Sequence, residues 1–186
     1  VRIMVDMRLE GAADEMGQSH LRKEIRVNGI SRPASDLVGV VNAVLFDAED
    51  IHLVSGPPAA RRRYLDILIC QMDKVYLRAR QRYQKVVYQR NHLLRLLREG
   101  RAQPRELDFW NDALLKEGVY ITVRRGHVVQ ELGALARDLY SQLTEGQEEL
   151  AVDYVPSIPA EGEGEGDVHG VFVRALEDGV GREIAL

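Results

Sequence analysis

Residues 57–99 read PPAARRRYLDILICQMDKVYLRARQRYQKVVYQRNHLLRLLRE. Apolar side chains recur there at three- and four-residue steps, the spacing that places them on one face of an α-helix. They are Leu65, Leu68, Met72, Val75, Ala79, Tyr83, Val86, Leu93 and Leu97. Pro57 and Pro58 follow Gly56, and proline suits the first turn of a helix. The pattern predicts one continuous helix, roughly 60 Å long at ~1.5 Å per residue.

A second helical pattern follows a reversal at Glu99–Pro104 and runs over residues 105–143. Glycine weakens a helix by ~1 kcal/mol relative to alanine, so a break near Gly118 or Gly126 stays open. Each arm alone would leave its apolar face in water. The two arms therefore predict an antiparallel helical hairpin.

Strand patterns precede the helices. Residues 2–9 and Leu21–Val27 alternate in polarity, and Asn28-Gly29 is a turn signal, which predicts an antiparallel hairpin or meander. Leu37–Phe46 is apolar nearly throughout and predicts a strand buried on both faces, although periodicity leaves a short helix open. The expected fold class is α+β: a partial antiparallel sheet plus a long antiparallel helical hairpin.

The C-terminal part predicts three shorter features. Glu149–Val155 alternates like a strand that returns to the sheet, Glu161–Asp167 is an acidic glycine-rich surface loop, and Val168–Leu176 is a short amphipathic helix. We expect a sheet segment over 1–55, a helical arm over 56–145 and a return segment over 146–186.

Composition excludes several classes of protein. No apolar run approaches the ~20 residues that span a bilayer. The sequence holds no phosphate-binding G-x-x-x-x-G-K-[ST] loop, no G-x-S-x-G elbow and no histidine pair at metal-ligand spacing. The single cysteine, Cys70, is expected to be a small core residue. We expect no catalytic residues and no metal site in this chain.

Charge is strongly segregated. The net charge is −4, yet residues 61–101 hold 12 Lys or Arg and 3 Asp or Glu, whereas residues 102–186 hold 7 and 17. The basic residues Arg63, Lys74, Arg78, Arg82 and Lys85 share a helix face away from the apolar one. Such a row either binds phosphates or pairs with acidic groups on the second arm, and the pattern alone favours neither.

Two further groups of charged residues, Arg61–Arg63 and Arg90, are considered separately. Arg61–Arg63 stand near a helix N-terminus, where cations oppose the helix dipole, and an Arg62–Asp66 pair is the alternative to a binding role. Arg90 falls on the apolar face, where a charge is costly unless paired. If the hairpin turns near residue 102, Arg90 pairs with Asp112 or Glu117 and fixes the register.

The stretch from Val41 to Asp66 resembles the signature of the RecF family, recombination-mediator ATPases of the ABC and SMC group. The matching types are Glu49, Asp50, Gly56, Pro58, Arg61, Arg62, Tyr64, Leu65 and Asp66. Ser19–Gly29, Gln81–Leu94 and Asp153–Ser157 match too, so the resemblance spans nearly the whole chain. Ala48 stands where proline is common, and Pro57 where serine usually caps the helix, which would move the cap to Ser55 or Gly56.

The resemblance implies an internal segment of an ATPase whose P-loop lies upstream and whose signature and Walker B motifs lie downstream. ATP and Mg would then belong to the whole protein, and this segment alone would be inactive. Phe46–Asp50 resembles the Q-loop region that couples nucleotide state to the arm, which makes Glu49 and Asp50 the candidate coupling residues. The resemblance favours DNA binding by the basic residues, and the candidate DNA-binding residues are Arg61, Arg62, Arg63, Lys74, Arg78, Arg82 and Lys85.

The resemblance also implies partners. It implies ATP-dependent homodimerisation, binding to duplex and gapped DNA, and cooperation with RecR and RecO in loading RecA during DNA repair, replication restart and the SOS response. The expected location is the bacterial cytoplasm, at the nucleoid. The alternative is an SMC-like structural spacer, or a surface for RecR or the dimer mate that does not contact DNA.

Overall fold

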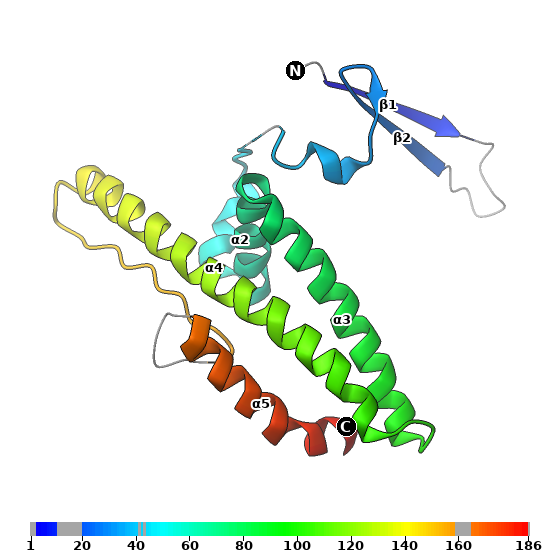
Figure 1. Cartoon of the computed structure of the whole chain (residues 1–186). Helices are drawn as coiled ribbons and strands as arrows, with labels where there is room; N and C mark the ends of the chain where they lie inside the picture. Colours follow the sequence, from blue (N-terminus) through cyan, green and yellow to red (C-terminus); the bar gives the residue numbers. More distant parts are fainter. Residues whose placement is uncertain (1–2, 11–19, 41, 43, 159–164, 186) are drawn as a thin grey trace.

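A computed structural model describes residues 3–10, 20–40, 42, 44–158 and 165–185. Its centre is an antiparallel pair of helices, α3 (Lys74–Arg98) and α4 (Leu107–Leu143), which lie side by side in Figure 1. The short 3₁₀ helix η3 (Pro104–Glu106) completes the reversal between them. The predicted helical hairpin is therefore confirmed, as is the α+β fold class.

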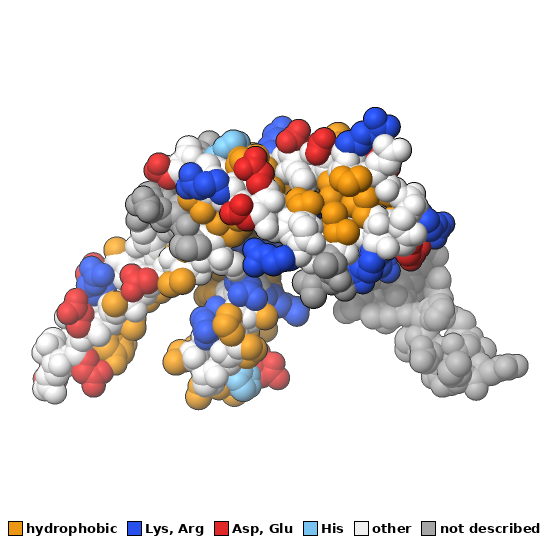
Figure 2. Space-filling view, turned by 90° about the horizontal axis from the view of Figure 1, so that it is seen from below, with side chains coloured by type: hydrophobic (Ala, Val, Ile, Leu, Met, Phe, Trp, Pro, Cys, Tyr) orange, Lys and Arg blue, Asp and Glu red, His pale blue; other side chains and the backbone are white. Residues whose placement is uncertain are grey.

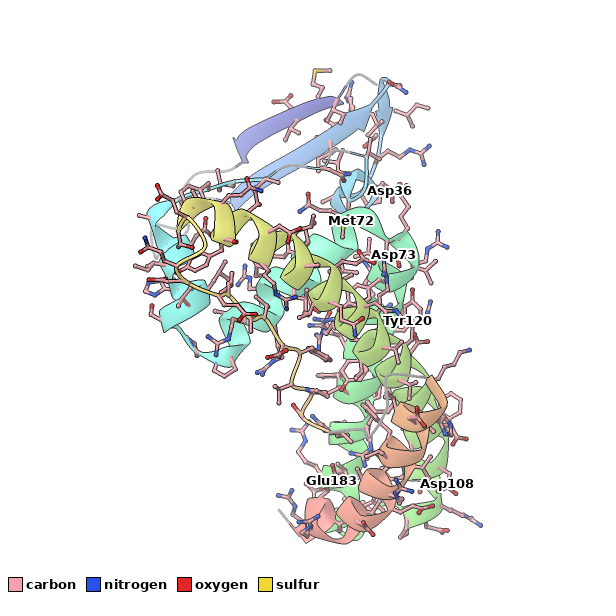
Figure 3. The ribbon with its side chains drawn as sticks, turned by 90° about the vertical axis from the view of Figure 1, so that its left-hand side faces the viewer. Asp36, Met72, Asp73, Asp108, Tyr120 and Glu183 are labelled. Carbon is pink, nitrogen blue, oxygen red and sulfur yellow. The ribbon has the colours of Figure 1, made fainter. Side chains whose placement is uncertain are left out.

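The prediction of one continuous helix over 57–99 is wrong. The chain forms α2 (Pro58–Met72) and then bends at Asp73, whose φ of −132° and ψ of 104° are extended. The Asp73 carboxylate accepts hydrogen bonds from the backbone N–H groups of Val75 (2.8 Å) and Tyr76 (3.1 Å). Aspartate competes in this way with helical backbone bonds and begins a new helix. Figure 3 shows α2 leaving the axis of α3 at Met72 and Asp73.

Two groups of apolar side chains hold the helices together. The larger one joins α2, α3 and α4 at the bend, and its most buried members include Ile69, Tyr76 and Val128. The smaller one lies at the opposite end of the hairpin, where Leu93, Leu97 and Leu107 pack with residues of the last helix. The predicted seam exists only in part: it is divided between two cores, and Met72 and Val75, which the pattern places on it, are 55% and 58% exposed beside the bend.

Glycines in α4 serve close packing and do not break the helix. A Cβ on Gly118 would lie 3.0 Å from the Phe172 ring, and one on Gly133 would lie 3.2 Å from the carbonyl oxygen of Val152. Gly118 thus admits α5 (Glu165–Ala185), which packs against both α3 and α4. The α4 helix is continuous through both predicted break points.

The C-terminal predictions need correction. The segment Glu149–Val155 is not a strand: it runs as extended coil along α4, with Tyr154 in the larger core. Val152 and Tyr154 lie against Gly133 and Gly126 of α4, whereas Val155 is 85% exposed, and the sheet lies at the other side of the molecule (Figure 1). The short helix expected at Val168–Leu176 is part of the longer α5. The acidic loop lies mostly outside the described residues, and Glu165–Asp167 open α5.

The N-terminal hairpin is confirmed. Strands β1 (Ile3–Glu10), β2 (His20–Val27) and β3 (Ile30–Ser31) form an antiparallel sheet in the order β1-β2-β3. Asn28 and Gly29 turn the chain between β2 and β3 with φ angles of 52° and 82°. Such positive φ values are those that asparagine and glycine tolerate best.

The buried strand predicted at Leu37–Phe46 is wrong. The chain forms the 3₁₀ helix η1 (Ala34–Leu37), an isolated bridge at Val38 and a turn at 39–40. Residues 44–47 are coil, and η2 (Ala48–Ile51) and α1 (His52–Ser55) follow. Val44 and Phe46 are 92% and 89% exposed, because no other described element covers this run. Figure 2 shows hydrophobic side chains along the projection that α1 and α2 form. Among the described helices, none is both long and apolar enough to cross a membrane.

Candidate nucleic-acid interface

Asp66 joins three helices at the bend between α2 and α3. Its Oδ1 accepts hydrogen bonds from the Tyr76 hydroxyl (2.5 Å) and from Arg125 (Nη2, 2.7 Å), and its Oδ2 accepts one from Arg80 (Nε, 2.7 Å). Arg125 Nε also donates to the Tyr76 oxygen at 3.0 Å. Asp66 is 8% exposed and Tyr76 is fully buried. One carboxylate of the signature stretch therefore anchors α3 and α4 to α2.

The same contacts shift the pKa values of this cluster. Burial raises the pKa of a carboxyl group, but the hydrogen bonds from Tyr76 and the two arginines outweigh burial and hold the pKa of Asp66 below its ordinary value. Burial, together with the bond that Tyr76 donates to Asp66, raises the pKa of the Tyr76 hydroxyl. Asp66 is therefore ionised and Tyr76 is protonated near neutral pH.

Asp73 makes a second link across the bend. Besides capping α3, its Oδ2 accepts hydrogen bonds from the Tyr120 hydroxyl and from Arg124 Nε, both at 3.3 Å and both from α4. Figure 3 labels Asp73 and Tyr120 on neighbouring helices at this corner. The angle between α2 and α3 is thus fixed by two carboxylates that α4 holds in place.

The Arg61 side chain forms hydrogen bonds with the backbone of the connection between α1 and α2. Its Nη1 donates to the carbonyl oxygens of Leu53 (3.2 Å), Val54 (3.4 Å) and Gly56 (3.0 Å), which satisfies acceptors at the C-terminal end of α1. A Cβ on Gly56 would lie only 2.4 Å from the carbonyl oxygen of His52. The signature residues Gly56 and Arg61 therefore shape the connection from α1 to α2.

Arg82 pairs with an acidic residue of the second arm, which is one of the two alternatives that the sequence left open for the basic residues. Its Nε and Nη2 donate to the two carboxylate oxygens of Glu117 on α4, at 2.6 and 2.9 Å. Glu117 is 7% exposed, and this hydrogen bond raises the pKa of Arg82. Acidic pairing with the second arm therefore accounts for Arg82.

The other basic residues of α3 form an exposed row. Lys74, Arg78 and Lys85 are separated by four and seven residues, so they share one helix face, and no ion pair joins them to a carboxylate among the described residues. A cleft of about 420 Å³ beside Lys74 and Arg78 extends to Gln81, where a second hollow beside Lys85 begins. We call Lys74, Arg78 and Lys85 the α3 row.

Arg62 and Arg63 lie at exposed positions of α2, whereas the α3 row belongs to the next helix. The alternative Arg62–Asp66 pair is absent from the described part of the chain, where Asp66 is occupied by Arg80 and Arg125. Both arginines line a cavity of about 620 Å³ between α2 and α3. Figure 2 shows Lys and Arg side chains gathered where the α1–α2 projection meets the helical body.

The predicted pairing of Arg90 with Asp112 or Glu117 is wrong. Arg90 is 4% exposed, as a position on the apolar face predicts, but its guanidinium binds Glu183 of α5 and Asn111 of α4. Glu117 of α4 instead pairs with Arg82, which precedes Arg90 by about two turns of α3. Glu183 was not predicted because the expected last helix ended at Leu176, before this residue. An amphipathic pattern followed to the end of α5 would have identified Glu183 as a possible partner.

Glu49 and Asp50 lie in η2, and their described contacts are capping bonds. Asp47 Oδ1 accepts from the Glu49 N–H at 2.7 Å, and Asp50 Oδ2 accepts from the Asp47 N–H at 3.0 Å. The N-cap of α2 is Pro57, not Ser55 or Gly56. Across the described residues, no group of three or more His, Cys, Asp or Glu is placed to hold a metal ion.

Comparisons with known proteins agree on one family. The chain is 44% identical over 140 residues to the DNA replication and repair protein RecF of Herpetosiphon aurantiacus, and 40% identical over 161 residues to that of Chloroflexus aggregans. These alignments cover 74% and 84% of this chain but 36% and 41% of the relatives. The chain thus spans about two fifths of the length of the curated relatives it matches.

Solved structures give the same fold. A structure of the recombination mediator protein RecF with ATP, from the RecFOR pathway, superposes with a TM-score of 0.81 at 24% identity. The superposition covers 88% of this chain and 44% of that one. No family model matches the sequence.

Proposed function

Because this chain belongs to the RecF family, we propose that it is the arm and adjoining head segment of a RecF-type protein and that its α3 row contacts the DNA backbone. The family's role is in DNA replication and repair. The observation that carries the proposal is the exposed α3 row: three cations on one helix face with no carboxylate partner among the described residues. Lys and Arg placed in this way bind phosphates and release counterions without reading base sequence.

The geometry narrows the set of contact residues. The charge of Arg82 is balanced by Glu117, and the Arg61 guanidinium donates hydrogen bonds to backbone carbonyl oxygens. Both residues therefore support DNA binding less strongly than the α3 row does. Gln81 and the 68% exposed Tyr88 flank the row on the same side of α3 and add hydrogen-bonding and stacking surface. Arg62 and Arg63 stay in the proposed set as contacts nearer the arm root.

The remaining activities belong to the whole protein. We propose ATP and Mg binding by parts of the protein outside this chain, ATP-dependent dimerisation, and cooperation with RecR and RecO in loading RecA at gapped DNA. Glu49 and Asp50 are proposed to transmit the nucleotide state through η2 and α1 to the arm. A solved RecF relative with ATP supports the cofactor. The proposed setting is nucleoid DNA in the bacterial cytoplasm, during repair and the SOS response.

A second candidate function is a structural spacer. The 37-residue α4 packs along α3 like a short coiled-coil arm, a shape that could position two heads or offer a surface to RecR. In that function, the α3 row would face solvent or a protein partner, and duplex DNA affinity would not depend on it.

Salt titration of the full-length protein with duplex DNA separates the two functions. The triple variant Lys74→Ala, Arg78→Ala, Lys85→Ala should weaken binding and flatten the slope of log K against log salt by about one for each lost phosphate contact. The matched control is Arg95→Ala, Arg98→Ala, Arg105→Ala, which removes three exposed cations at the far end of the hairpin. An unchanged slope in the first variant would overturn DNA binding by the α3 row.

A further inference from the structure

The cavity between α2 and α3 has four arginines around it and a single carboxylate. Its volume is about 620 Å³, and its charged lining comprises Arg62, Arg63, Asp66, Arg80 and Arg125. These residues come from α2, α3 and α4, so the cavity exists only when the three helices meet at the bend. The uncharged wall includes Ile67 and Cys70.

The positive charge at this cavity exceeds what the protein balances. Asp66 serves both Arg80 and Arg125, whose side chains are only 27% and 14% exposed, so one carboxylate faces two partly desolvated guanidinium groups. Arg62 and Arg63 add two more cations, and neither forms an ion pair with a carboxylate among the described residues. The charge that Asp66 leaves unbalanced on Arg80 and Arg125 is partly removed from water and therefore costly, and a bound anion would lower that cost, with the exposed Arg62 and Arg63 as further donors.

We propose that this cavity binds a phosphate group, carried either by nucleic acid or by a nucleotide. Guanidinium groups offer paired N–H donors whose fork matches two oxygens of a phosphate, and the further oxygens of a phosphate can accept from a second arginine, which a single carboxylate offers less well. Arg62 and Arg63 supply the donors from α2. Arg80 and Arg125, held in orientation by Asp66, supply the positive field at the base of the cavity.

The proposal stands apart from DNA binding by the α3 row. None of Lys74, Arg78 and Lys85 lines this cavity, and Arg80 lies roughly 140° round the helix from that face. A phosphate seated here would join α2 to α3 and α4. It would thereby strengthen the bend at Asp73.

Cys70 supplies a local readout, because it lines the cavity and is a free, half-buried cysteine. Burial raises the pKa of its thiol, so alkylation is slow and sensitive to what covers it. The rate of Cys70 alkylation is measured by peptide mass spectrometry on the full-length protein. The probes are inorganic phosphate, ATP without Mg, and a short duplex DNA, each matched in ionic strength with chloride.

We expect saturable protection of Cys70 by inorganic phosphate. The double variant Arg62→Gln, Arg63→Gln should weaken it about tenfold or more, as loss of charge-assisted hydrogen bonds predicts. The control Arg95→Gln, Arg98→Gln should leave protection unchanged. Stronger protection by DNA than by ATP identifies a nucleic-acid phosphate, and the reverse identifies a nucleotide. No protection by any probe, or equal protection in the double variant, would overturn the phosphate site.

Discussion

Arg90 of α3 and Glu183 of α5 form a two-point ion pair across 93 residues of sequence. Arg90 Nη1 donates to Glu183 Oε1 at 3.1 Å, and Nη2 donates to Oε2 at 2.6 Å. The arginine is 4% exposed, while the glutamate side chain is 39% exposed. The pair lies beside the smaller core, so it fixes α5 against the end of the hairpin that is farther from the bend.

Removing the carboxylate should therefore destabilise the docking of α5. Glu183→Gln leaves the buried Arg90 charge without its anion, and we expect a loss of about 1–3 kcal/mol in the free energy of unfolding. Urea denaturation measures it. Glu177→Gln, on an exposed position of the same helix, is the control and should change stability by less than about 0.5 kcal/mol. Equal midpoints for the two variants would show that the ion pair contributes nothing.

Gly56 should not tolerate a side chain. In Gly56→Ala the new Cβ would meet the His52 carbonyl oxygen at 2.4 Å, so α1 or the start of α2 must move. We expect a cost of about 1–3 kcal/mol, as for other overpacked sites. Amide exchange near the α1–α2 junction should rise, because the new Cβ would weaken the hydrogen bond from the Gly56 N–H to the His52 carbonyl, which is 2.9 Å long in the native chain. Unchanged exchange at Gly56 would contradict this account of the signature glycine.

Stability should fall with acid through Asp66. Its pKa is lower in the folded chain than in the unfolded one, so the stabilisation is fully present above the unfolded pKa of about 4. It is lost as pH falls from there through the folded pKa. Asp66→Asn should be less stable at pH 7 and decline less below about pH 4. Urea midpoints across this range measure the difference, with the exposed Asp112→Asn as control. Parallel curves for both variants would contradict the role of Asp66.

Helical periodicity predicted the hairpin because the apolar face of each arm repeats over many turns. It missed the bend at Asp73, since the apolar spacing continues unbroken from Met72 to Val75 and the cap depends on a single side chain. Aspartate followed by helix-forming residues was the available signal. The exposed run at Val44–Phe46 was misread for a different reason. An apolar run implies burial somewhere, but it does not say that the burying element lies within the same chain.

The candidate site, like the fold, was predictable only in part. Charge segregation located the basic helix, and the face analysis separated Arg90 from the α3 row. Pairing partners were not predictable, because Arg82–Glu117 and Arg90–Glu183 depend on the register of α4 and on a third helix. The four-arginine cavity exists only because of the bend, so the prediction of one straight helix over residues 57–99 could not include it.

Two glycine-to-alanine changes should have opposite signs. Gly118 lies where α4 meets α5, and a Cβ there would lie 3.0 Å from Phe172 and 3.5 Å from Tyr83. Gly118→Ala should therefore loosen α5 and lower stability by about 1–3 kcal/mol, despite the better helix propensity of alanine. Gly170 lies within α5 with open space around it, so Gly170→Ala should stabilise by up to about 1 kcal/mol. Thermal unfolding measures both. If Gly118→Ala also stabilised the chain, close packing would not be the reason for glycine at this position, and helix propensity alone would decide both sites.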